Sequence, residues 1–440
     1  MQSNGLLIRL AQVKMRVGRC GWAFAVDIIG SAWLGEVLFM CSIKNFRLAL
    51  VLVASRAAFA GSAAQQSTPA TGGLANSAPP PPFAQVVNQY FSQWDSNGDG
   101  KLTPDEINAA VANPKFHDEA AAAIAAIRMV VHDGGKYTLP PITQVYLVSS
   151  PLREASTSDE QIDLQDDPSK PDKFDHPPAF EPRYRRALKR LRPASRDLFP
   201  QSLPSLDAIH QQGLGDCPFV STVGAMVHRN PSAVKAMFTQ NDDGSTTVAF
   251  GDGSRVKVAR VTDADIVICS TAGTNGLWLT ILEKAYRKNH LKTLHPIRRD
   301  RPDIYDRMAS AGVIEMLDGH QIRRVDLRSR RGDPRFPITM RQDLNAALRE
   351  HRLVKAVTSH SAKKSIPGIV PAHAYAILGY NDDTGLVHVW NPHSNNFTPK
   401  GPDGLQYGYT TKAGQFDIPL RDLLQIYDGV NFETQTPNRH

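Results

Sequence analysis

The chain has 440 residues, of which 41% are hydrophobic and 21% are charged, enough apolar material for two or three domains. This composition excludes a disordered chain and a polytopic membrane protein. The formal net charge is +7, and arginines cluster in RYRRALKRLR (183–192) and RRVDLRSRRGDPR (323–335). These runs lack a pattern of interleaved aromatic residues, so we interpret them as solvated faces and expect no nucleic-acid partner.

Residues 1–60 are interpreted as an N-terminal leader. The segment from about 40 to 60 has a basic start at Lys44, then an apolar run, and ends in the small-residue pattern Ala58-Phe59-Ala60. This is the layout of a secretory signal peptide. We therefore expect an exported protein, secreted or periplasmic, with no stable membrane span after the leader is removed.

The start of the signal peptide suggests where the natural chain begins. Met40 stands just before the basic residue of the signal peptide, so we hypothesise that residues 1–39 come from an over-extended start. The competing interpretation is a signal-anchor helix over residues 20–40. Asp27 and Glu36 disfavour it, because charged residues are costly inside a bilayer.

The chain contains four cysteines, and two of them lie in the leader. Removal of the leader takes away Cys20 and Cys41 and leaves Cys217 and Cys269. Cys269 lies in ADIVICS (264–270), an apolar, strand-like run in which a lone cysteine is usually buried. We therefore expect no disulfide framework.

The rest of the chain divides by composition. Residues 61–82 are rich in Ala, Ser, Gly and Pro and are interpreted as a linker. A small helical module is expected over 83–149, and the polar, proline-dotted segment 150–199 is interpreted as a second linker or a pro-like segment. Helical and strand-like patterns alternate over 200–440 without an internal repeat. The pattern predicts two ordered units joined by a tether.

The stretch DSNGDGKLTPDE (95–106) has the spacing of a twelve-residue EF-hand calcium loop. Gly100 permits the sharp turn, and Leu102 is the apolar plug. Ca²⁺ requires six or seven oxygen ligands, which this spacing arranges around one point. The expected ligands are the side chains of Asp95, Asn97, Asp99 and Glu106 and the main-chain carbonyl of Lys101.

The segments on both sides of this loop support two flanking helices. In FAQVVNQYFSQW (83–94) the apolar residues fall on one helical stripe. Thr103 is a helix cap, and Pro104 suits the first helical position of the following helix. Because EF-hands usually pair, we interpret 116–147 as a degenerate partner, with a helix, a shortened turn, a strand-like KYT and a further apolar segment, that binds no metal.

The motif QQGLGDCPFV (211–220) places Cys217 at the start of a probable helix, because apolar residues recur after it with helical period and Pro218 suits a first turn. The helix dipole and the free N–H groups at that end favour a thiolate over a thiol. The same N–H groups can hold an oxyanion, and the side-chain amide of Gln211 is a second candidate donor.

A base and an orienting group are found downstream. Residues 371–394 are expected to form a β-hairpin, because two apolar runs flank the turn signal YNDDTG. If this turn centres on Asp382, His373 and Asn391 lie opposite each other on one face. An asparagine so placed can hold a histidine ring in one tautomer while the ring pairs with a cysteine. The alternative for His373 is a hydrogen-bonded core histidine.

Four blocks of this sequence resemble the calpain-type, papain-like cysteine proteases. QQGLGDCPFV resembles Q-G-x-x-G-D-C-W, LWLTILEKAYRKN (277–289) resembles W-x-x-L-L-E-K-A-Y-A-K, AHAYAI resembles G-H-A-Y-S-V, and WNPHS resembles R-N-P-W-G. The order of cysteine, histidine and asparagine also suits the family. The similarity covers about residues 200–430, roughly half of the chain.

The resemblance implies an α+β fold: a two-lobed protease domain preceded here by the all-α EF-hand module. One lobe, mainly helical, would carry the cysteine and a hairpin at 246–261, and a β-rich lobe would carry the histidine and the asparagine. By position, Cys217 is the nucleophile, His373 the base and then the acid, Asn391 the orienting residue and Gln211 an oxyanion donor. Glu283 and Tyr286 fall in the family's helix, where packing is the expected role.

The sequence also departs from the family pattern. Pro218 replaces the aromatic residue after the nucleophile, His393 replaces the tryptophan that shields the asparagine, and Gln212 stands where glycine is preferred. In the animal enzymes the EF-hands follow the protease domain, whereas here a single hand precedes it. Calcium control is therefore not carried over by analogy.

The sequence supports an exported, calcium-binding cysteine endopeptidase that acts on protein or peptide substrates. The alternative is a catalytically inactive scaffold that acts as a calcium-dependent binding protein; the intact set of Cys217, His373, Asn391 and Gln211 argues against it. Transglutaminase-like acyl transfer is disfavoured by the LEKAYRK block. A metalloenzyme is disfavoured because the histidines form no two-His helix motif. The oligomeric state is open.

Overall fold

The computed structural model describes residues 79–133, 139–149, 180–200, 203–293, 312–358 and 366–437. The leader (1–60), most of the 61–82 linker, residues 150–179 and the KYT segment (136–138) lie outside the described residues. Within the described ranges, no helix combines the length and the hydropathy needed to cross a bilayer.

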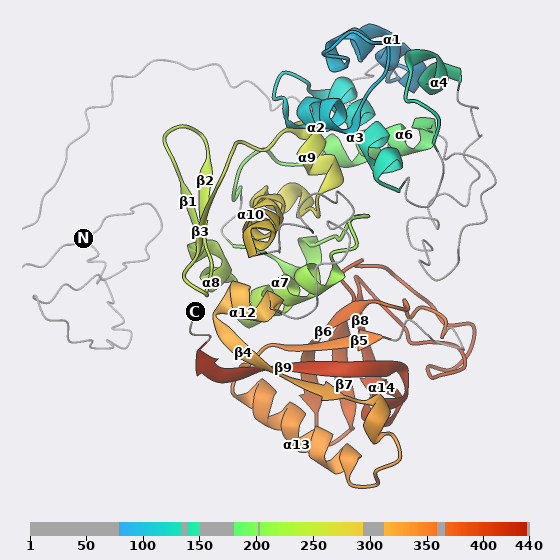
Figure 1. The fold of residues 1–440 in the computed structure, drawn as a ribbon. Helices are drawn as coiled ribbons and strands as arrows, with labels where there is room; N and C mark the ends of the chain where they lie inside the picture. Colours follow the sequence, from blue (N-terminus) through green and yellow to red (C-terminus); the bar gives the residue numbers. More distant parts are fainter. Residues whose placement is uncertain are drawn as a thin grey trace, which may run out of the picture. The chain divides into compact units, whose positions relative to one another are not determined.

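The N-terminal part of the described chain is a group of helices (Figure 1). They are α1 (Phe83–Trp94), α2 (Pro104–Ala112), α3 (Asp118–Asp133), α4 (Gln144–Ser149) and α6 (Phe180–Leu191). α1 buries Phe83, Val87, Phe91 and Trp94, as the stripe of apolar residues predicts. At the start of α2, Thr103 and Glu106 form a capping box, in which each side chain accepts the other residue's backbone N–H.

α6 lies inside the segment that the sequence analysis interpreted as a polar linker. Its apolar side chains recur at helical spacing and pack against α1: the rings of Phe180 and Phe83 stack with centroids 5.4 Å apart. The Tyr184 hydroxyl donates to the carbonyl of Pro81 at 3.1 Å. Average composition concealed this helix, because basic residues fill its outer face and prolines surround it. The linker interpretation was therefore wrong for 180–191.

α9 (Asp263–Ile268) is a helix where the sequence suggested a strand. A capping box between Thr262 and Asp265 begins it, and Cys269 is its C-cap. A six-residue apolar run has no periodicity that separates strand from helix, so the cap decides the outcome. Cys269 is buried and unpaired with another cysteine, as expected.

The N-terminal helices share a hydrophobic core with α9. One cluster of buried residues contains side chains of α1, α2, α3 and α6, the apolar residues of 264–269 and Leu214 of the glycine-rich loop. Two hydrogen bonds join the same parts: Asp118 N–H donates to Asp263 Oδ2 at 3.0 Å, and Thr262 Oγ1 donates to the carbonyl of Val111 at 2.8 Å. The module is thus packed on the rest of the described chain, which differs from the expected tethered unit.

The middle of the chain is mainly helical, with one small sheet. Its helices are α7 (Cys217–Arg229), α8 (Pro231–Ala236), α10 (Trp278–Thr293) and α12 (Val313–Asp318), with 3₁₀ turns η2 (Leu206–Ala208) and η3 (Gly273–Asn275). An antiparallel sheet consists of β1 (Phe238–Gln240), β2 (Thr246–Ala249) and β3 (Arg255–Val258). The hairpin expected over 246–261 is β2–β3, with Val248 opposite Val256.

The C-terminal part is a six-stranded antiparallel sheet of strand order β4-β9-β5-β6-β7-β8. The strands are β4 (His320–Asp326), β5 (Val354–Thr358), β6 (Ala374–Asn381), β7 (Leu386–Trp390), β8 (Gln415–Pro419) and β9 (Tyr427–Pro437). The helical elements here are η5 (Arg328–Arg330), α13 (Phe336–Arg349) and α14 (Leu420–Ile426).

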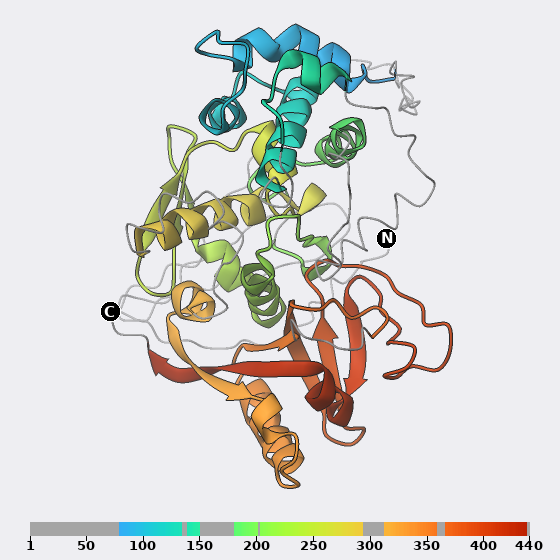
Figure 2. The same cartoon turned by 45° about the vertical axis from the view of Figure 1, so that its right-hand side comes forward.

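The two faces of this sheet serve two separate cores. Tyr375 and Ile377 of β6 belong to the core that includes α13, whereas Ala376 and Leu378 belong to the core that includes α7. Figures 1 and 2 show α13 and α7 on opposite sides of the sheet. α7 lies close to β7 because Gly224 has no side chain: a Cβ there would meet the Trp390 ring at 2.2 Å. This contact brings the cysteine helix beside the strand that ends at Trp390.

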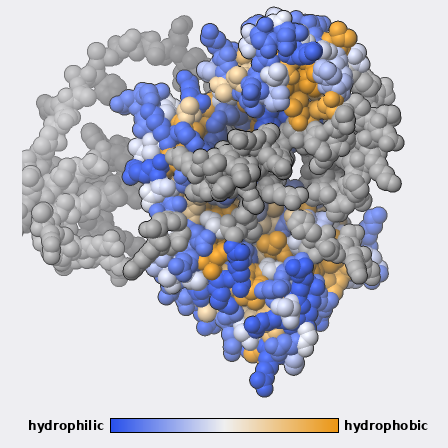
Figure 3. Space-filling model, in the orientation of Figure 1, coloured by the Kyte–Doolittle hydropathy of each residue, from blue (hydrophilic) through white to orange (hydrophobic). Residues whose placement is uncertain are grey.

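The surface of the described residues is mostly hydrophilic on the face shown in Figure 3. Hydrophobic side chains reach this surface near α4, where Val145 is 77% exposed. A single exposed apolar residue of this kind is common on protein surfaces.

Candidate active site

Cys217 is the first residue of α7, as the apolar periodicity predicts. The turn that leads into it requires Gly215, whose φ is +65°, and Pro218 occupies the first turn of the helix. The sulfur accepts a hydrogen bond from the backbone N–H of Ala374, at the start of β6. The cysteine loop and the histidine strand therefore meet, although 156 positions separate Cys217 from His373.

His373 and Asn391 are in direct contact. His373 Nε2 lies 2.8 Å from Asn391 Oδ1, and both side chains are buried. Because the Asn391 amide nitrogen donates to Asn395 at 2.9 Å, its oxygen faces the ring, and Nε2 must carry the hydrogen. Nδ1 of His373 is then the nitrogen free to accept a proton. Thr358 Oγ1 accepts the His373 N–H at 2.9 Å and holds its backbone.

The hairpin that carries this pair has a different register from the predicted one. In the structure Ala376 is opposite Trp390 and Asn381 is opposite Leu386. The turn therefore centres beyond Asp382, and the register also shifts between Ile377 and Gly379. His373 is consequently diagonal to Asn391, and long side chains bridge a diagonal pair readily. The predicted pair thus meets, but not through the predicted register.

Gln211 is held beside the asparagine strand by its backbone. Its N–H donates to the carbonyl of Pro392 at 2.9 Å, and Ser394 Oγ donates to the carbonyl of Ile209 at 2.5 Å. The side-chain oxygen of Gln211 is buried and has no hydrogen-bond partner among the described residues. The two bonds connect the loop before Cys217 to the residues that follow Asn391.

The charges of the site are set mainly by burial. Cys217 is 9% exposed, and burial raises the pKa of its thiol to about 11, against the smaller effects of the Ala374 N–H and the Lys355 charge. Burial lowers the pKa of His373 well below its usual value; His393 adds to this decrease, and Asn391 opposes it. Burial therefore favours a neutral Cys217 thiol and a neutral His373 imidazole.

His393 lies against His373 where the family pattern has tryptophan. The two rings meet edge to face, with centroids 4.5 Å apart and an interplanar angle of 80°. Burial lowers the pKa of His393 to about 4, so the ring is neutral at physiological pH. The His393 backbone N–H also donates to Asn391 Oδ1 at 3.1 Å. His393 thus covers the His373 ring as an uncharged aromatic group.

A buried pair of carboxyl groups lies behind Cys217. Asp216 is fully buried, and burial, together with the neighbouring Glu283, raises its pKa well above the usual value. Ser270 connects the two, because its hydroxyl donates to Asp216 at 3.3 Å and its N–H donates to Glu283 at 2.7 Å. Arg287 is 3.2 Å from Glu283. Asp216 lies in the motif QQGLGDCPFV and Glu283 in the motif LWLTILEKAYRKN. The role expected for Glu283 from the sequence is packing.

Sequence reasoning did not identify Lys355. It lies in the apolar strand β5, is 1% exposed, and its Nζ donates to the carbonyl of Pro218 at 3.2 Å. The sequence signal was a lysine in the middle of the strand VKAVT, where a charged residue is unusual unless it is paired.

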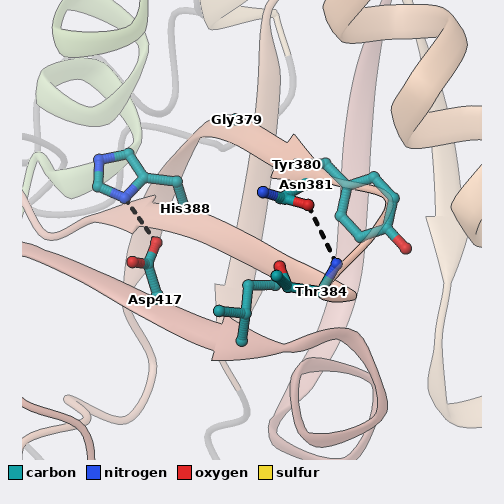
Figure 4. Close-up of a pocket in the computed structure, with 7 residues that line it drawn as sticks. Gly379, Tyr380, Asn381, Thr384, His388 and Asp417 are labelled. Atoms are coloured by element: carbon teal, nitrogen blue, oxygen red, sulfur yellow. Dashed lines mark hydrogen bonds and ion pairs between the residues drawn. The ribbon is translucent and has the colours of Figure 1, made fainter.

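A surface hollow of about 360 Å³ lies elsewhere, on β6, β7 and β8 (Figure 4). It contains none of the predicted site residues. Its polar groups satisfy one another: His388 Nδ1 lies 2.8 Å from Asp417 Oδ1, and Asn381 Oδ1 accepts the Thr384 N–H at 3.0 Å. We assign it no role in the chemistry of Cys217.

The loop 95–106 connects α1 to α2, and its polar side chains turn inward to its own backbone. Asp95 accepts the N–H groups of Gly98 and Gly100, each at 2.8 Å. Glu106 accepts four backbone or hydroxyl donors besides the Thr103 N–H, and these hydrogen bonds lower its pKa to about 2. Asn97 and Asp99 each accept the N–H two residues further along, at 2.8 and 2.9 Å.

The loop fits a calcium ion by the chemistry of its donors. Asp95, Asp99 and Glu106 form no ion pair with any described lysine or arginine, so their charges are available to a cation. The glycines at 98 and 100 adopt positive φ values of +71° and +78°, which the tight turn requires. A backbone bridge also joins Lys101 to Thr143, just before α4. The segment expected to be a degenerate partner therefore pairs with the loop.

The chain is similar to known proteins over part of its length. The family model of calpain family cysteine proteases matches residues 181–402, a range that contains Cys217, His373 and Asn391. A maize (Zea mays) protein, calpain-type cysteine protease DEK1, is 30% identical over 233 residues, which are 47% of this chain and 10% of that protein. The chain thus spans about a tenth of the length of this relative. Because the family match extends over half of its residues, this protein belongs to the calpain family of cysteine proteases.

Proposed function

We propose that this protein is an exported cysteine endopeptidase in which Cys217 is the nucleophile, His373 the base and then the acid, and Asn391 the orienting residue. The observation that carries the proposal is the 2.8 Å contact between His373 Nε2 and Asn391 Oδ1, made where the Ala374 N–H reaches the Cys217 sulfur. This arrangement leaves His373 Nδ1 as the nitrogen that accepts the thiol proton.

Acylation begins from the neutral thiol of Cys217 and the neutral imidazole of His373. As a peptide carbonyl approaches, the Cys217 S–H proton moves to His373 Nδ1 and the sulfur attacks the carbonyl carbon. The carbonyl oxygen becomes an oxyanion that accepts hydrogen bonds from the N–H groups of the first turn of α7 and from the Gln211 side-chain amide. His373 then gives the proton to the amide nitrogen, the C–N bond breaks, and the amine leaves a thioester on Cys217.

Deacylation reverses the roles. A water molecule gives a proton to His373 and attacks the thioester carbon, the C–S bond breaks, and the proton returns to the sulfur. Asn391 accepts the Nε2 hydrogen throughout and stabilises the imidazolium as it forms. The products are a carboxylic acid and a regenerated thiol, so the cycle consumes one water molecule for each peptide bond.

The substrate is a protein or peptide, and it would lie between the helical part that carries Cys217 and the sheet that carries His373 and Asn391. This is the two-lobed arrangement of papain-like proteases, with α7 in the helical part and β6 and β7 in the six-stranded sheet. The signal-peptide pattern of residues 40–60 supports export.

We also propose that Asp95, Asn97, Asp99, Lys101 and Glu106 form an EF-hand that binds Ca²⁺. The ion would neutralise three carboxylates and fix the angle between α1 and α2. Since α2 and α3 share a core with α9 and Leu214, the ion stabilises the surface against which the loop before Cys217 packs.

The test of the function is active-site labelling of the full chain with an epoxysuccinyl probe, in calcium and in chelator. We expect labelling at Cys217, loss of labelling in Cys217→Ala, and retention in the matched control Cys269→Ala, because Cys269 is also buried but lies outside the site. Absence of labelling in folded protein under both conditions would favour an inactive scaffold instead.

A further inference from the structure

Three side chains from different elements meet beside the end of α7 that lies away from Cys217. Asp318 ends α12, His320 begins β4, and Glu433 lies on β9 (Figures 1 and 2). His320 Nδ1 is 2.8 Å from Asp318 Oδ2 and 2.9 Å from Glu433 Oε1. Arg229, which contacts both carboxylates, is the last residue of α7 and lies about 18 Å along the helix from Cys217. The cluster is therefore separate from the candidate active site.

The backbone brings these three side chains together. Gly319, between Asp318 and His320, has a φ of +82°, and a Cβ there would collide with a backbone carbonyl oxygen. Only glycine permits this turn, which places Asp318 beside His320. The register of β4 with β9 shifts between His320 and Ile322, and Ile322 is opposite Glu433. Such an irregularity redirects a side chain, here the His320 ring, toward the neighbouring strand.

Each carboxylate is oriented by a further donor. The Arg229 guanidinium donates to Asp318 Oδ1 and, at 3.0 Å, to Glu433 Oε2, whereas it reaches Asp318 Oδ2 only at 3.4 Å. The Leu353 N–H donates to Glu433 Oε2 at 2.6 Å. These donors hold one oxygen of each carboxylate and leave the other, Oδ2 or Oε1, facing His320.

Two carboxylate oxygens thus face one imidazole nitrogen. Among the described residues, Arg229 is the only lysine or arginine that pairs with either carboxylate, so two negative charges share one positive charge. The side chains of Asp318 and Glu433 are 10% and 5% exposed, so the remaining negative charge is costly. A further positive charge is needed here, and it is either a proton on His320 or a metal ion.

We propose that Asp318, His320 and Glu433 bind a divalent transition-metal ion of the zinc class. A proton on Nδ1 points at one oxygen at a time, whereas a metal ion accepts lone pairs from all three atoms at once. The three ligand atoms lie within 4.8 Å of one another. A tetrahedral zinc ion holds its ligand atoms about 3.3 Å apart, so His320 would have to move by only roughly 0.4 Å.

The donor set selects the kind of ion. One imidazole nitrogen with two carboxylate oxygens suits Zn²⁺ or Co²⁺, whereas Ca²⁺ prefers six or more oxygens. The His320 side chain is 37% exposed, so the ion can enter from solvent and keep a water molecule as its fourth ligand. Asp318 and Arg229 also line a surface hollow of about 260 Å³. Arg229 would stay on the opposite carboxylate oxygens as an outer-sphere partner. The ion would join α12 and β4 to β9.

The test is titration of the chelator-treated full chain with Co²⁺ in excess Ca²⁺, followed by visible absorption and calorimetry. His320→Ala removes the nitrogen ligand, and Asp318→Asn removes one carboxylate charge at nearly constant shape. His388→Ala is the matched control. Its side chain is 36% exposed, and its Nδ1 lies 2.8 Å from a single carboxylate, that of Asp417, in the same sheet.

We expect one Co²⁺ per chain, displaced by Zn²⁺ but not by Ca²⁺. His320→Ala and Asp318→Asn should each weaken binding by about 100-fold, because loss of even an outer-sphere partner costs about 10- to 100-fold. His388→Ala should bind as the unmodified chain does. Co²⁺ should also raise the unfolding temperature of the unmodified chain and not that of His320→Ala. Thermal unfolding in chelator checks that each variant is folded.

Three results would overturn the proposal. Equal affinity in His320→Ala and the unmodified chain would place the ion elsewhere. A sulfur-to-metal charge-transfer band, or loss of binding in Cys217→Ala, would place it at the thiol. Absence of binding would leave the cluster as an ion pair of a protonated His320 with its two carboxylates. None of these measurements depends on peptidase activity, so the metal site stands or fails independently of the proposed function.

Discussion

The backbone N–H of Asp118 donates to the carboxylate of Asp263 at 3.0 Å, and this bond joins the first turn of α3 to the first turn of α9. Arg196 holds the same carboxylate through two nitrogens, at 3.0 and 3.2 Å. Asp263 therefore joins the N-terminal module to α9. The chain continues from α9 to Ser270, whose hydroxyl donates to the buried Asp216.

Replacement of Asp263 should weaken this junction. Asp263→Ala leaves the Asp118 N–H without its acceptor and Arg196 without its partner, so we expect a loss of about 1–3 kcal/mol in the free energy of unfolding. Asp243→Ala is the matched control, because its ion pair with Lys257 is exposed and its hydrogen bonds with Ser245 stay within one turn, so its loss should be smaller. Urea unfolding measures both, and equal losses would contradict the assigned role of Asp263.

On the proposed calcium site, calcium should raise the unfolding temperature of the chain by mass action, because the ion would bind the folded loop. Glu106→Gln removes one carboxylate ligand and should abolish most of this increase, whereas the adjacent Asp105→Asn should keep it, since Asp105 is not an expected ligand. Differential scanning fluorimetry in calcium and in chelator measures the effect. Magnesium in place of calcium should raise the temperature less. A calcium response that survives Glu106→Gln would place the ion elsewhere.

His393 should make the protein sensitive to acid. Its folded pKa of about 4 is below the usual 6.5, so the unfolded chain binds more protons between these values. This contribution to stability is complete above about pH 6.5 and is lost as the pH falls toward 4. His393→Trp has no titrating group there and should lose less stability over this window. Unfolding free energies at pH 7 and pH 4.5 measure the difference, and parallel losses would contradict it.

Gly224→Ala tests the packing of α7, the helix that begins at Cys217, against Trp390 of β7. The added methyl would collide with the Trp390 ring, which costs about 1–3 kcal/mol by overpacking, whereas the better helix propensity of alanine returns about 1 kcal/mol. We expect a net loss of stability of about 1 kcal/mol and slower probe labelling, because α7 moves away from β7. Gly332→Ala meets no atom within 4 Å and is the control. Faster labelling would contradict the expected displacement.

The residues of the candidate site were predictable where the neighbouring sequence indicates their position. Cys217 follows a glycine turn and precedes a helical stripe, so its place at the start of α7 needed no tertiary information. The contact of His373 with Asn391 was found through a hairpin of slightly wrong register, because loop length and a shift at Gly379 depend on packing. The alternation of residues along the strands was still sufficient to place His373 and Asn391 on one face, because diagonal neighbours on one face remain within side-chain reach.

Other features depended on packing that no single segment records. The helix 180–191 was hidden by the polar composition around it, although its apolar residues have helical spacing. α9 was too short for its period to be read, and the cap at Thr262 decided its type. The contact of Lys355 with α7 could not be predicted from β5 alone. The carbonyl to which its Nζ donates belongs to Pro218, 137 positions away in the chain.

The burial of Cys217 has a consequence for its chemical lifetime. Oxidation to sulfenic acid requires a thiolate that is accessible to the oxidant. A neutral thiol that is 9% exposed offers neither property, so Cys217 should resist peroxide in the folded protein. The same burial that limits the access of a substrate to Cys217 would thus protect its thiol from an oxidant.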